Sequence, residues 1–273
     1  MRHILSATSL LVIIANLLFW SIVIVIFATL RIVPHERLQA VVVRALEWIY
    51  RRTVGVHTFW LTRVLGIRLH VHGTPPTNGN ETMIITCNHV SWFDMFVVHA
   101  VITSRGPIIK FLVKRELLFV PIVGWICVAM GFPRLQRSGH SGGRMQDYRK
   151  VEDAAKEVGR FPGALFSFTE GTRFTPVKRD EQGSPYRHLL NPRSGGLRIM
   201  LATLKNVAVY DVTIAYPRFV SFWQYLGGAV RDIHIYVDRF ESTEIQNANA
   251  WLAARWSAKD ELIDAVLQED HAP

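Results

Sequence analysis

The longest charge-free run in the chain constrains its fold most strongly. From Ile4 to Leu30 there is no Asp, Glu, Lys or Arg. As a helix, these 27 residues would extend about 40 Å, which exceeds the roughly 30 Å hydrocarbon core of a bilayer. The apolar region of a cleaved signal peptide, the alternative, is shorter, at about 7 to 15 residues. We therefore expect residues 1–31 to form a tilted transmembrane anchor.

The basic residues around this run are distributed unevenly. Arg2 alone precedes it, whereas five arginines follow it closely: Arg31, Arg37, Arg44, Arg51 and Arg52. Because basic flanks stay on the cytoplasmic side of a membrane, the remainder of the chain is expected to face the cytoplasm.

Residues 32–68 have the pattern of an amphipathic helical region. Apolar residues recur there at helical spacing, at Leu38, Val41, Val42, Ala45, Leu46 and Ile49. The apolar face of such a helix can pack on a globular domain or lie in the membrane interface. Both placements are compatible with the pattern.

The composition leaves room for one further domain, expected at residues 69–273 of the 273-residue chain. A net charge of +9 would suit nucleic acid, anionic lipid or polyanionic small molecules, but no nucleic-acid-binding motif accompanies it. Membrane lipid is therefore the expected partner, and nucleic acid is not. The only two cysteines, Cys87 and Cys127, lie in apolar stretches, which argues against a disulfide framework.

Apolar runs that alternate with helical patterns predict an α/β sheet with helices packed on its faces. The expected strands are 69–72, 83–87, 108–113, 164–168, 207–214 and 230–237. Residues 177–193 are expected to form a long loop, and residues 248–268 a terminal amphipathic helix. His70 and His72 share a strand face and could bind a metal, but we interpret them as surface histidines because no third ligand is apparent.

A histidine and a carboxylate follow the second of these strands, in Asn88-His89-Val90-Ser91-Trp92-Phe93-Asp94. With a helix expected from Ser91 to Ala100, His89 falls in the strand-to-helix turn and can reach Asp94 there. A neutral imidazole can take a proton from an attacking hydroxyl while a carboxylate fixes its tautomer. Alternatively, Asp94 is a first-turn acid that favours the helix dipole, and His89 is a neighbour of the cap.

Three further segments that combine charged residues with Gly or Pro follow along the chain. They comprise Lys114, Glu116, Leu117, Pro121, Gly124 and Trp125, then Gly131-Phe132-Pro133-Arg134, then Phe168-Thr169-Glu170-Gly171-Thr172-Arg173. Together with residues 88–94, these blocks resemble the 1-acylglycerol-3-phosphate O-acyltransferase family of glycerolipid acyltransferases, which make phosphatidic acid from lysophosphatidic acid. The resemblance covers about residues 82–217. A fourth block, residues 212–217, fits only loosely, and residues 191–197 resemble a Pro-Arg segment of the longer subgroup.

The resemblance implies a central mixed sheet flanked by helices and specific roles for the matched residues. It makes His89 the general base and Asp94 the residue that orients it. It makes Arg173, then Lys114 and Arg134, candidates for binding the acceptor phosphate. Gly171 and Thr172 complete the turn, in which backbone amides would serve the oxyanion. Glu170 either binds acceptor hydroxyls or anchors the loop.

The resemblance also implies the substrates. The acyl donor would be acyl-CoA or acyl carrier protein, and the acceptor a lysophospholipid, 1-acylglycerol 3-phosphate, with no metal or redox cofactor. A bacterial inner membrane is the expected location. Three alternatives remain open: a lysophospholipid acyltransferase that remodels lipids with larger head groups, a hydrolase, and a non-catalytic lipid-binding membrane protein.

Overall fold

A six-stranded mixed sheet forms the centre of the molecule, which is a computed structural model that describes residues 2–30, 33, 35–111, 113–114, 118–120, 122–130, 132, 134–135, 149, 152 and 163–269. β7 and β8 are antiparallel, and the other neighbouring strands are parallel. The strands in spatial order are β1 (Arg68–Gly73), β8 (Asp232–Glu241), β7 (Ala208–Ala215), β2 (Met83–Cys87), β6 (Ala164–Phe168) and β3 (Ile109–Phe111). A separate pair consists of β4 (Val113–Lys114) and β5 (Arg134–Leu135).

The apolar runs of the sequence become the buried central strands. Every residue of β2 and β7 is buried, because helices cover both faces of the sheet there. The expected strands at 83–87 and 164–168 are confirmed with these bounds. The mixed sheet expected from the resemblance is confirmed as well.

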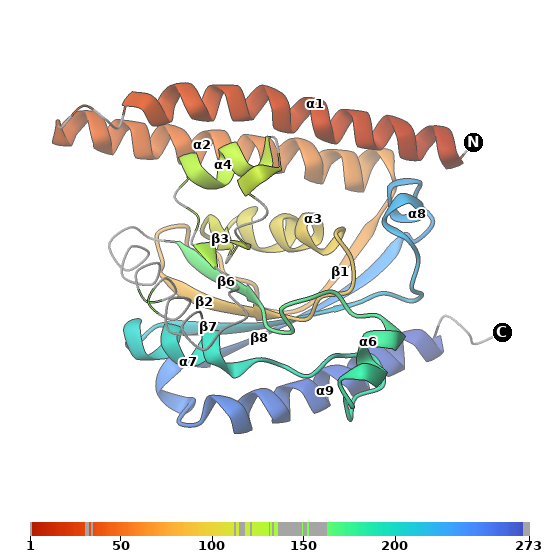
Figure 1. Cartoon of the computed structure of the whole chain (residues 1–273). Helices are drawn as coiled ribbons and strands as arrows, with labels where there is room; N and C mark the ends of the chain where they lie inside the picture. The colour runs from red at the N-terminus through yellow and green to blue at the C-terminus, as the bar shows by residue number, and fades with distance from the viewer. Residues whose placement is uncertain are drawn as a thin grey trace.

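Helices lie on both faces of the sheet (Figure 1). On one face are α3 (Asp94–Val98), its continuation η3 (His99–Thr103) and α4 (Val123–Ala129). On the other face are α6 (Pro176–Glu181), α7 (Ser194–Thr203) and α9 (Ala248–Glu269). The short helices α8 (Phe222–Leu226) and η5 (Ser242–Glu244) flank β8.

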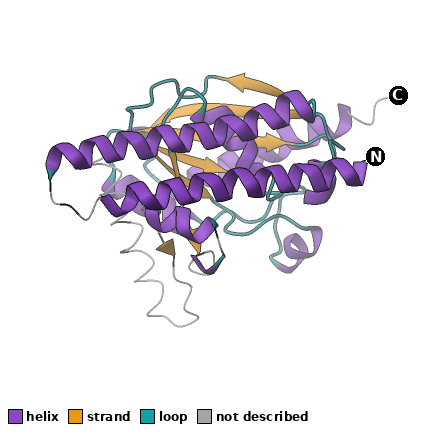
Figure 2. Cartoon of the chain, turned by 90° about the horizontal axis from the view of Figure 1, so that it is seen from above, coloured by secondary structure: helices purple, strands orange, loops and turns teal. Residues whose placement is uncertain are grey.

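Two long helices form an outer layer over α3 and α4. They are α1 (Arg2–Thr29) and α2 (Glu36–Phe59), which continues as η2 (Trp60–Val64), and they run side by side (Figures 1 and 2). α1 has 28 residues and is long and apolar enough to cross a membrane. Its outward face carries exposed apolar side chains, among them Leu11, Phe19, Ile22 and Ile26.

The inward face of α1 is tied to the protein by polar side chains. Ser6 donates to the carbonyl oxygen of Trp223 at 2.8 Å, and Ser9 accepts from the Trp60 indole at 3.0 Å. Asn16 donates to the carbonyl oxygen of Thr53 at 3.1 Å and lies 2.9 Å from His57 Nε2. These contacts fix α1 to α8 through Ser6, to η2 through Ser9 and to α2 through Asn16.

Two sequence predictions of local structure were wrong. The helix expected from Ser91 begins at Asp94, because the Asp94 carboxylate accepts from the amides before it and holds them in a turn. The loop expected at residues 177–193 contains α6. Its start is set by Thr175, whose hydroxyl accepts from the Lys178 amide at 3.2 Å, and by Pro176 in the first turn.

Candidate active site

The candidate site lies where β2 and β6 end side by side. The two strands are parallel, and Cys87 is in register with Phe168, so the chain leaves both strands at the same edge of the sheet. The Thr169 amide donates to the carbonyl oxygen of Cys87 at 3.1 Å and joins the two exits. This edge is where open α/β sheets commonly bind ligands.

His89 and Asp94 are in direct contact at this edge. His89 Nδ1 lies 2.8 Å from Asp94 Oδ2, which also accepts from the amides of Val90 at 2.7 Å and Ser91 at 2.9 Å. The His89 ring stacks on Phe168, with centroids 3.9 Å apart. The side chain of Asp94 is 1% exposed and that of His89 12%, so the carboxylate is enclosed while the imidazole reaches the surface.

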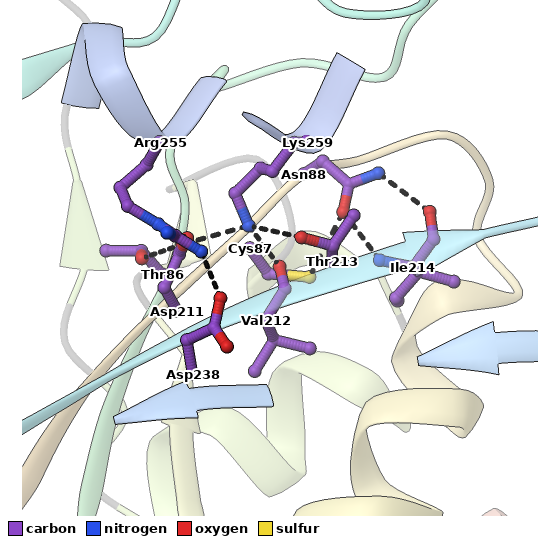
Figure 3. A network of polar contacts seen from close by, with 10 residues as sticks. All are labelled: Thr86, Cys87, Asn88, Asp211, Val212, Thr213, Ile214, Asp238, Arg255 and Lys259. Carbon is purple, nitrogen blue, oxygen red and sulfur yellow. Dashed lines mark hydrogen bonds and ion pairs between the residues drawn. The ribbon is translucent and has the colours of Figure 1, made fainter. Parts of the chain in front are cut away.

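The second oxygen of Asp94 is held by a residue that the sequence did not identify. The Tyr216 hydroxyl donates to Asp94 Oδ1 at 2.6 Å. Tyr216 belongs to the loosely matched fourth block, which runs out of β7. Its backbone position is set nearby by Asn88, whose side chain donates to the carbonyl oxygen of Ile214 at 3.0 Å and accepts from its amide at 2.9 Å (Figure 3).

Glu170 is inside the protein rather than open to a ligand. It is fully buried, and neither carboxylate oxygen has a hydrogen-bond partner among the described residues. Burial, together with the charge of Asp94, raises the pKa of Glu170 well above its usual range. This pKa is lowered in part by Lys259, by the Trp256 indole and by the His89 backbone, but the net shift remains upward. In this conformation an acceptor hydroxyl does not reach Glu170.

The turn after Glu170 depends on glycine. Gly171 has a φ of +71°, a backbone conformation that side chains disfavour. Its amide donates to the carbonyl oxygen of Phe168 at 2.9 Å, so this amide is engaged within the turn. A Cβ at Gly171 would meet side-chain atoms of Arg193 at 3.4 to 3.5 Å. These are ordinary van der Waals distances, so the positive φ and not the proximity of Arg193 makes glycine necessary here.

Lys178 fixes the next two residues of the turn. Its ammonium donates to the Thr172 hydroxyl at 3.0 Å and to the carbonyl oxygen of Arg173 at 3.1 Å. The Arg173 guanidinium lies over the ring of Trp92, 4.9 Å from the centroid. Trp92 is 44% exposed. It supports Arg173 rather than packing into the core as its neighbour Phe93 does.

Lys114 and Arg134 are placed only by their backbones. Val113 pairs with Arg134, and Lys114 with Leu135, in the two-stranded sheet. Their side chains lie outside the described residues, as do Glu116, Leu117, Pro121, Gly131 and Pro133 of the matched blocks. Their expected part in phosphate binding stays a prediction.

A buried charged network lies beneath the site and joins α9 to the sheet (Figure 3). Asp211 in β7 accepts from Thr86 at 2.8 Å, from Arg255 at 2.7 Å and from Lys259 at 2.9 Å. Burial would raise the pKa of Asp211, but the charges of Lys259 and Arg255 and their hydrogen bonds lower it below its usual value. Arg255 also bonds Asp238.

His70 and His72, considered above as possible metal ligands, have two further polar side chains beside them. His72 Nε2 lies 3.2 Å from His234 Nδ1, and His70 bonds Asp232 at 2.7 Å. No group of three potential ligands in the described part of the chain has the arrangement to hold a metal ion.

The arrangement can act as a base on a hydroxyl group. If His89 Nδ1 carries the proton that it shares with Asp94, Nε2 holds a lone pair. Arginines flank the same edge at positions 173 and 193. A base beside guanidinium groups suits an alcohol that carries an anionic substituent.

The family model and the similar proteins that comparison with known proteins finds are all acyltransferases. The family model for the Acyltransferase domain matches residues 68–217, which include β1, the His89 turn, the Glu170 turn and Tyr216. Lysophosphatidylinositol acyltransferase 10 of Caenorhabditis elegans is 25% identical over 95% of this chain and 71% of its own length. The probable 1-acyl-sn-glycerol-3-phosphate acyltransferase 5 of Arabidopsis thaliana is 28% identical over 71% of this chain. The human 1-acyl-sn-glycerol-3-phosphate acyltransferase delta is 29% identical over 67% of this chain.

The chain spans 56% of the Arabidopsis protein and 52% of the human protein, just over half the length of each. In three dimensions it is similar to the 1-acyl-sn-glycerophosphate acyltransferase of Thermotoga maritima, with a TM-score of 0.60. That match covers 100% of this chain and 99% of the other at 16% identity, which shows a shared fold. The chain belongs to the acyltransferase family that includes the 1-acylglycerol-3-phosphate acyltransferases.

Proposed function

We propose that this protein transfers a fatty acyl group from acyl-CoA or acyl carrier protein to the free hydroxyl of 1-acylglycerol 3-phosphate, and so makes phosphatidic acid. The observation that carries the proposal is the 2.8 Å contact between His89 Nδ1 and Asp94 Oδ2, at a strand end within the matched family region. The names of the Arabidopsis and human relatives support the choice of acceptor.

The reaction follows from the position of the imidazole. His89 Nε2 takes the proton of the acceptor hydroxyl as its oxygen attacks the thioester carbonyl carbon. The tetrahedral intermediate then collapses, the carbon-sulfur bond breaks, and the thiolate leaves and takes up the proton from His89. Asp94 holds the tautomer and stabilises the transient imidazolium. The enzyme forms no covalent intermediate.

Phosphate recognition falls to the guanidinium groups at the same edge. Arg173 is the first candidate because Trp92 and the Lys178 contacts hold its backbone and its guanidinium in place. Lys114 and Arg134 are further candidates by resemblance. Thr172 contributes by binding Lys178, and Gly171 by adopting the positive φ that the turn requires. We assign Glu170 an internal role in the loop, because it is fully buried.

A second acceptor class is favoured by one observation. The relative that aligns over 95% of this chain is named a lysophosphatidylinositol acyltransferase. A lysophospholipid with a larger head group keeps the phosphate and the free glycerol hydroxyl, so the same base and arginines would serve it. The two acceptors differ in what lies beyond the phosphate.

The membrane placement is also part of the proposal. We assign residues 1–31 as the anchor, 32–68 as the membrane-interface region and 69–273 as the acyltransferase domain. The length and apolar composition of α1 and the exposed apolar side chains of Trp48 and Phe59 in α2 support this division. The arginines after α1 support a cytoplasmic orientation, and we assign the membrane as a bacterial inner membrane.

The test is a product panel with purified full-length protein in detergent. Radiolabelled acyl-CoA and acyl carrier protein are each offered with lysophosphatidic acid, lysophosphatidylinositol, monoacylglycerol or no acceptor, and the products are separated by thin-layer chromatography. Labelled phosphatidic acid as the main product supports the proposal. Labelled phosphatidylinositol as the main product selects the second acceptor. Free fatty acid with every acceptor would mean a hydrolase, and an unchanged donor a non-catalytic protein.

A further inference from the structure

The carboxylate that orients His89 is held from two sides. Oδ2 faces the turn, where it meets the imidazole and two backbone amides. Oδ1 faces the opposite way and accepts from the Tyr216 hydroxyl at 2.6 Å. A carboxylate with bonds to only one oxygen can rotate about its Cβ–Cγ bond, whereas one bonded at both oxygens is fixed in plane and direction. Asp94 is therefore fixed in part by Tyr216, a residue that follows β7 and is distant in sequence.

Tyr216 is itself held firmly. It is fully buried, and its ring lies 4.8 Å from that of Tyr225, which stacks on Phe93 at 5.1 Å. Two residues earlier, the paired bonds between the Asn88 side chain and the Ile214 backbone fix the end of β7 against the end of β2. The residue that precedes His89 thus fixes the end of β7, which directly precedes Tyr216.

We propose that Tyr216 is a positioning residue for the acyl transfer, which fixes Asp94 so that its Oδ2 presents to His89 Nδ1. The inference rests on the proposed function, since it assigns His89 as the base. Tyr216 touches neither the reacting atoms nor the substrate in this assignment. It acts only through Asp94.

The hydroxyl remains a donor throughout the working pH range. Burial, together with the charge of Asp94, raises the pKa of Tyr216 well above its usual value, so the phenol stays protonated. The other titratable groups around Asp94 are His89 in the turn, Tyr225 in α8, Glu170 after β6 and Cys87 in β2. None of these other groups bonds Asp94 Oδ1 in the described residues.

The test compares Tyr216→Phe with Tyr225→Phe. Tyr225 is equally buried in the same aromatic cluster, but its hydroxyl bonds the carbonyl oxygen of Arg218, at 3.4 Å, and not Asp94. Tyr216→Phe should lower kcat about 10-fold and leave KM for acyl donor and acceptor nearly unchanged. Without its second donor, Asp94 becomes a stronger acceptor for the imidazole proton. The acidic limb of the kcat profile should then move to higher pH, and Tyr225→Phe should change neither quantity.

A second variant distinguishes the loss of the hydrogen bond from a defect in folding. Fluorotyrosine placed at position 216 keeps the shape of the ring but is a stronger donor, so it should move the acidic limb to lower pH. Tyr216→Phe in an Asp94→Asn background should add no further loss, because Tyr216 acts through Asp94. Equal kcat and pH profiles for Tyr216→Phe and Tyr225→Phe, or no shift with fluorotyrosine, would overturn the inference.

The same experiment separates this inference from the proposed function. If His89→Gln and Asp94→Asn keep the wild-type kcat, the base assignment itself fails. If those two variants are inactive while Tyr216→Phe behaves like Tyr225→Phe, only the role of Tyr216 fails.

Discussion

Arg173 illustrates how a residue can be held ready for a ligand by its neighbours. Its guanidinium rests over Trp92, and Lys178 holds its carbonyl oxygen. Arg173→Ala should therefore weaken kcat/KM for lysophosphatidic acid by about 1.5 to 3 kcal/mol, because charge-assisted bonds to phosphate are lost. Lysine should restore activity only partly, because it lacks the planar fork.

The matched controls for this prediction are a substrate and a variant. Monoacylglycerol has no phosphate, so Arg173→Ala should slow its acylation much less. Arg105→Ala, at an exposed arginine, should leave both acceptors unchanged. If Arg173→Ala slows both acceptors by the same factor, Arg173 holds the Glu170 turn and does not recognise phosphate.

Glu170 predicts a pH dependence of stability. Its folded-state pKa is raised above the ordinary value of 4.5 by burial and by Asp94. Between these two pKa values the folded protein keeps a proton that the unfolded chain has lost, so Glu170 makes the free energy of unfolding fall as pH rises. Glu170→Gln should remove this decline and stabilise the protein relative to wild type at about pH 8 more than at about pH 5.

The measurement for Glu170 is denaturant unfolding in detergent across that pH range. Glu181→Gln, at an exposed position, serves as the control and should follow the wild-type curve. An identical pH slope for wild type and Glu170→Gln would show that the buried carboxyl group is not the source of the dependence.

At the residue scale, spacing along the chain predicted the His89–Asp94 pair but not the contact of Tyr216 with Asp94. His89 and Asp94 are five positions apart, and a strand-to-helix turn brings them together with no help from distant residues. Tyr216 is 122 positions from Asp94 along the chain, and only the pairing of β2 with β7 places it there. A tyrosine at a strand end carries no signal of such a contact. Burial of Glu170 likewise depends on where α9 docks.

At the scale of elements, the polar side chains on the inward face of α1 predict a specific stabilisation. Asn16→Leu would remove the bonds to Thr53 and His57, and the free energy of unfolding should fall by about 1 kcal/mol. Thr8→Val is the control on the same helix, since Thr8 is exposed and bonds only its own helix at Ile4. Thermal unfolding in micelles measures both. Equal melting temperatures for the two variants would mean that the bonds of Asn16 add nothing to the stability of the protein.

The elements themselves were largely predictable because short apolar runs between turns became buried strands and helical spacing of apolar residues became helices. β2, β6 and α9 lie where the sequence expects them, within one residue. The errors arose where side chains bond backbone amides. Asp94 delays the start of α3, and Thr175 starts α6 inside an apparent loop. Such bonds depend on single residues and leave hydrophobic periodicity unchanged.

At the scale of the whole molecule, the order of strands could not be predicted. β8 inserts between β1 and β7, although β1 precedes it by more than 150 residues, and it reverses the strand direction at β7. Alternation of strands and helices predicts a sheet but not which strands are neighbours. The layer of α1 and α2 over α3 and α4 is a further arrangement that periodicity does not specify.

That outer layer predicts how the protein binds membranes. The exposed apolar side chains of α1 and α2 should keep the full-length protein in the membrane pellet after washes with high salt and alkaline carbonate, because salt screens only charge. After deletion of residues 1–31, part of the affinity should persist through Trp48 and Phe59 of α2. Immunoblots of pellet and supernatant measure this. Release of the full-length chain by carbonate would contradict an apolar anchor.

The most direct test of the central claim is the turnover of His89→Gln and Asp94→Asn. Each is purified in detergent, shown to unfold at a temperature close to that of wild type, and given labelled acyl-CoA with lysophosphatidic acid. Both variants should lower kcat by about two to four orders of magnitude, since the first removes the base and the second its orientation. Wild-type turnover in either folded variant would contradict the assignment of His89 as a base oriented by Asp94.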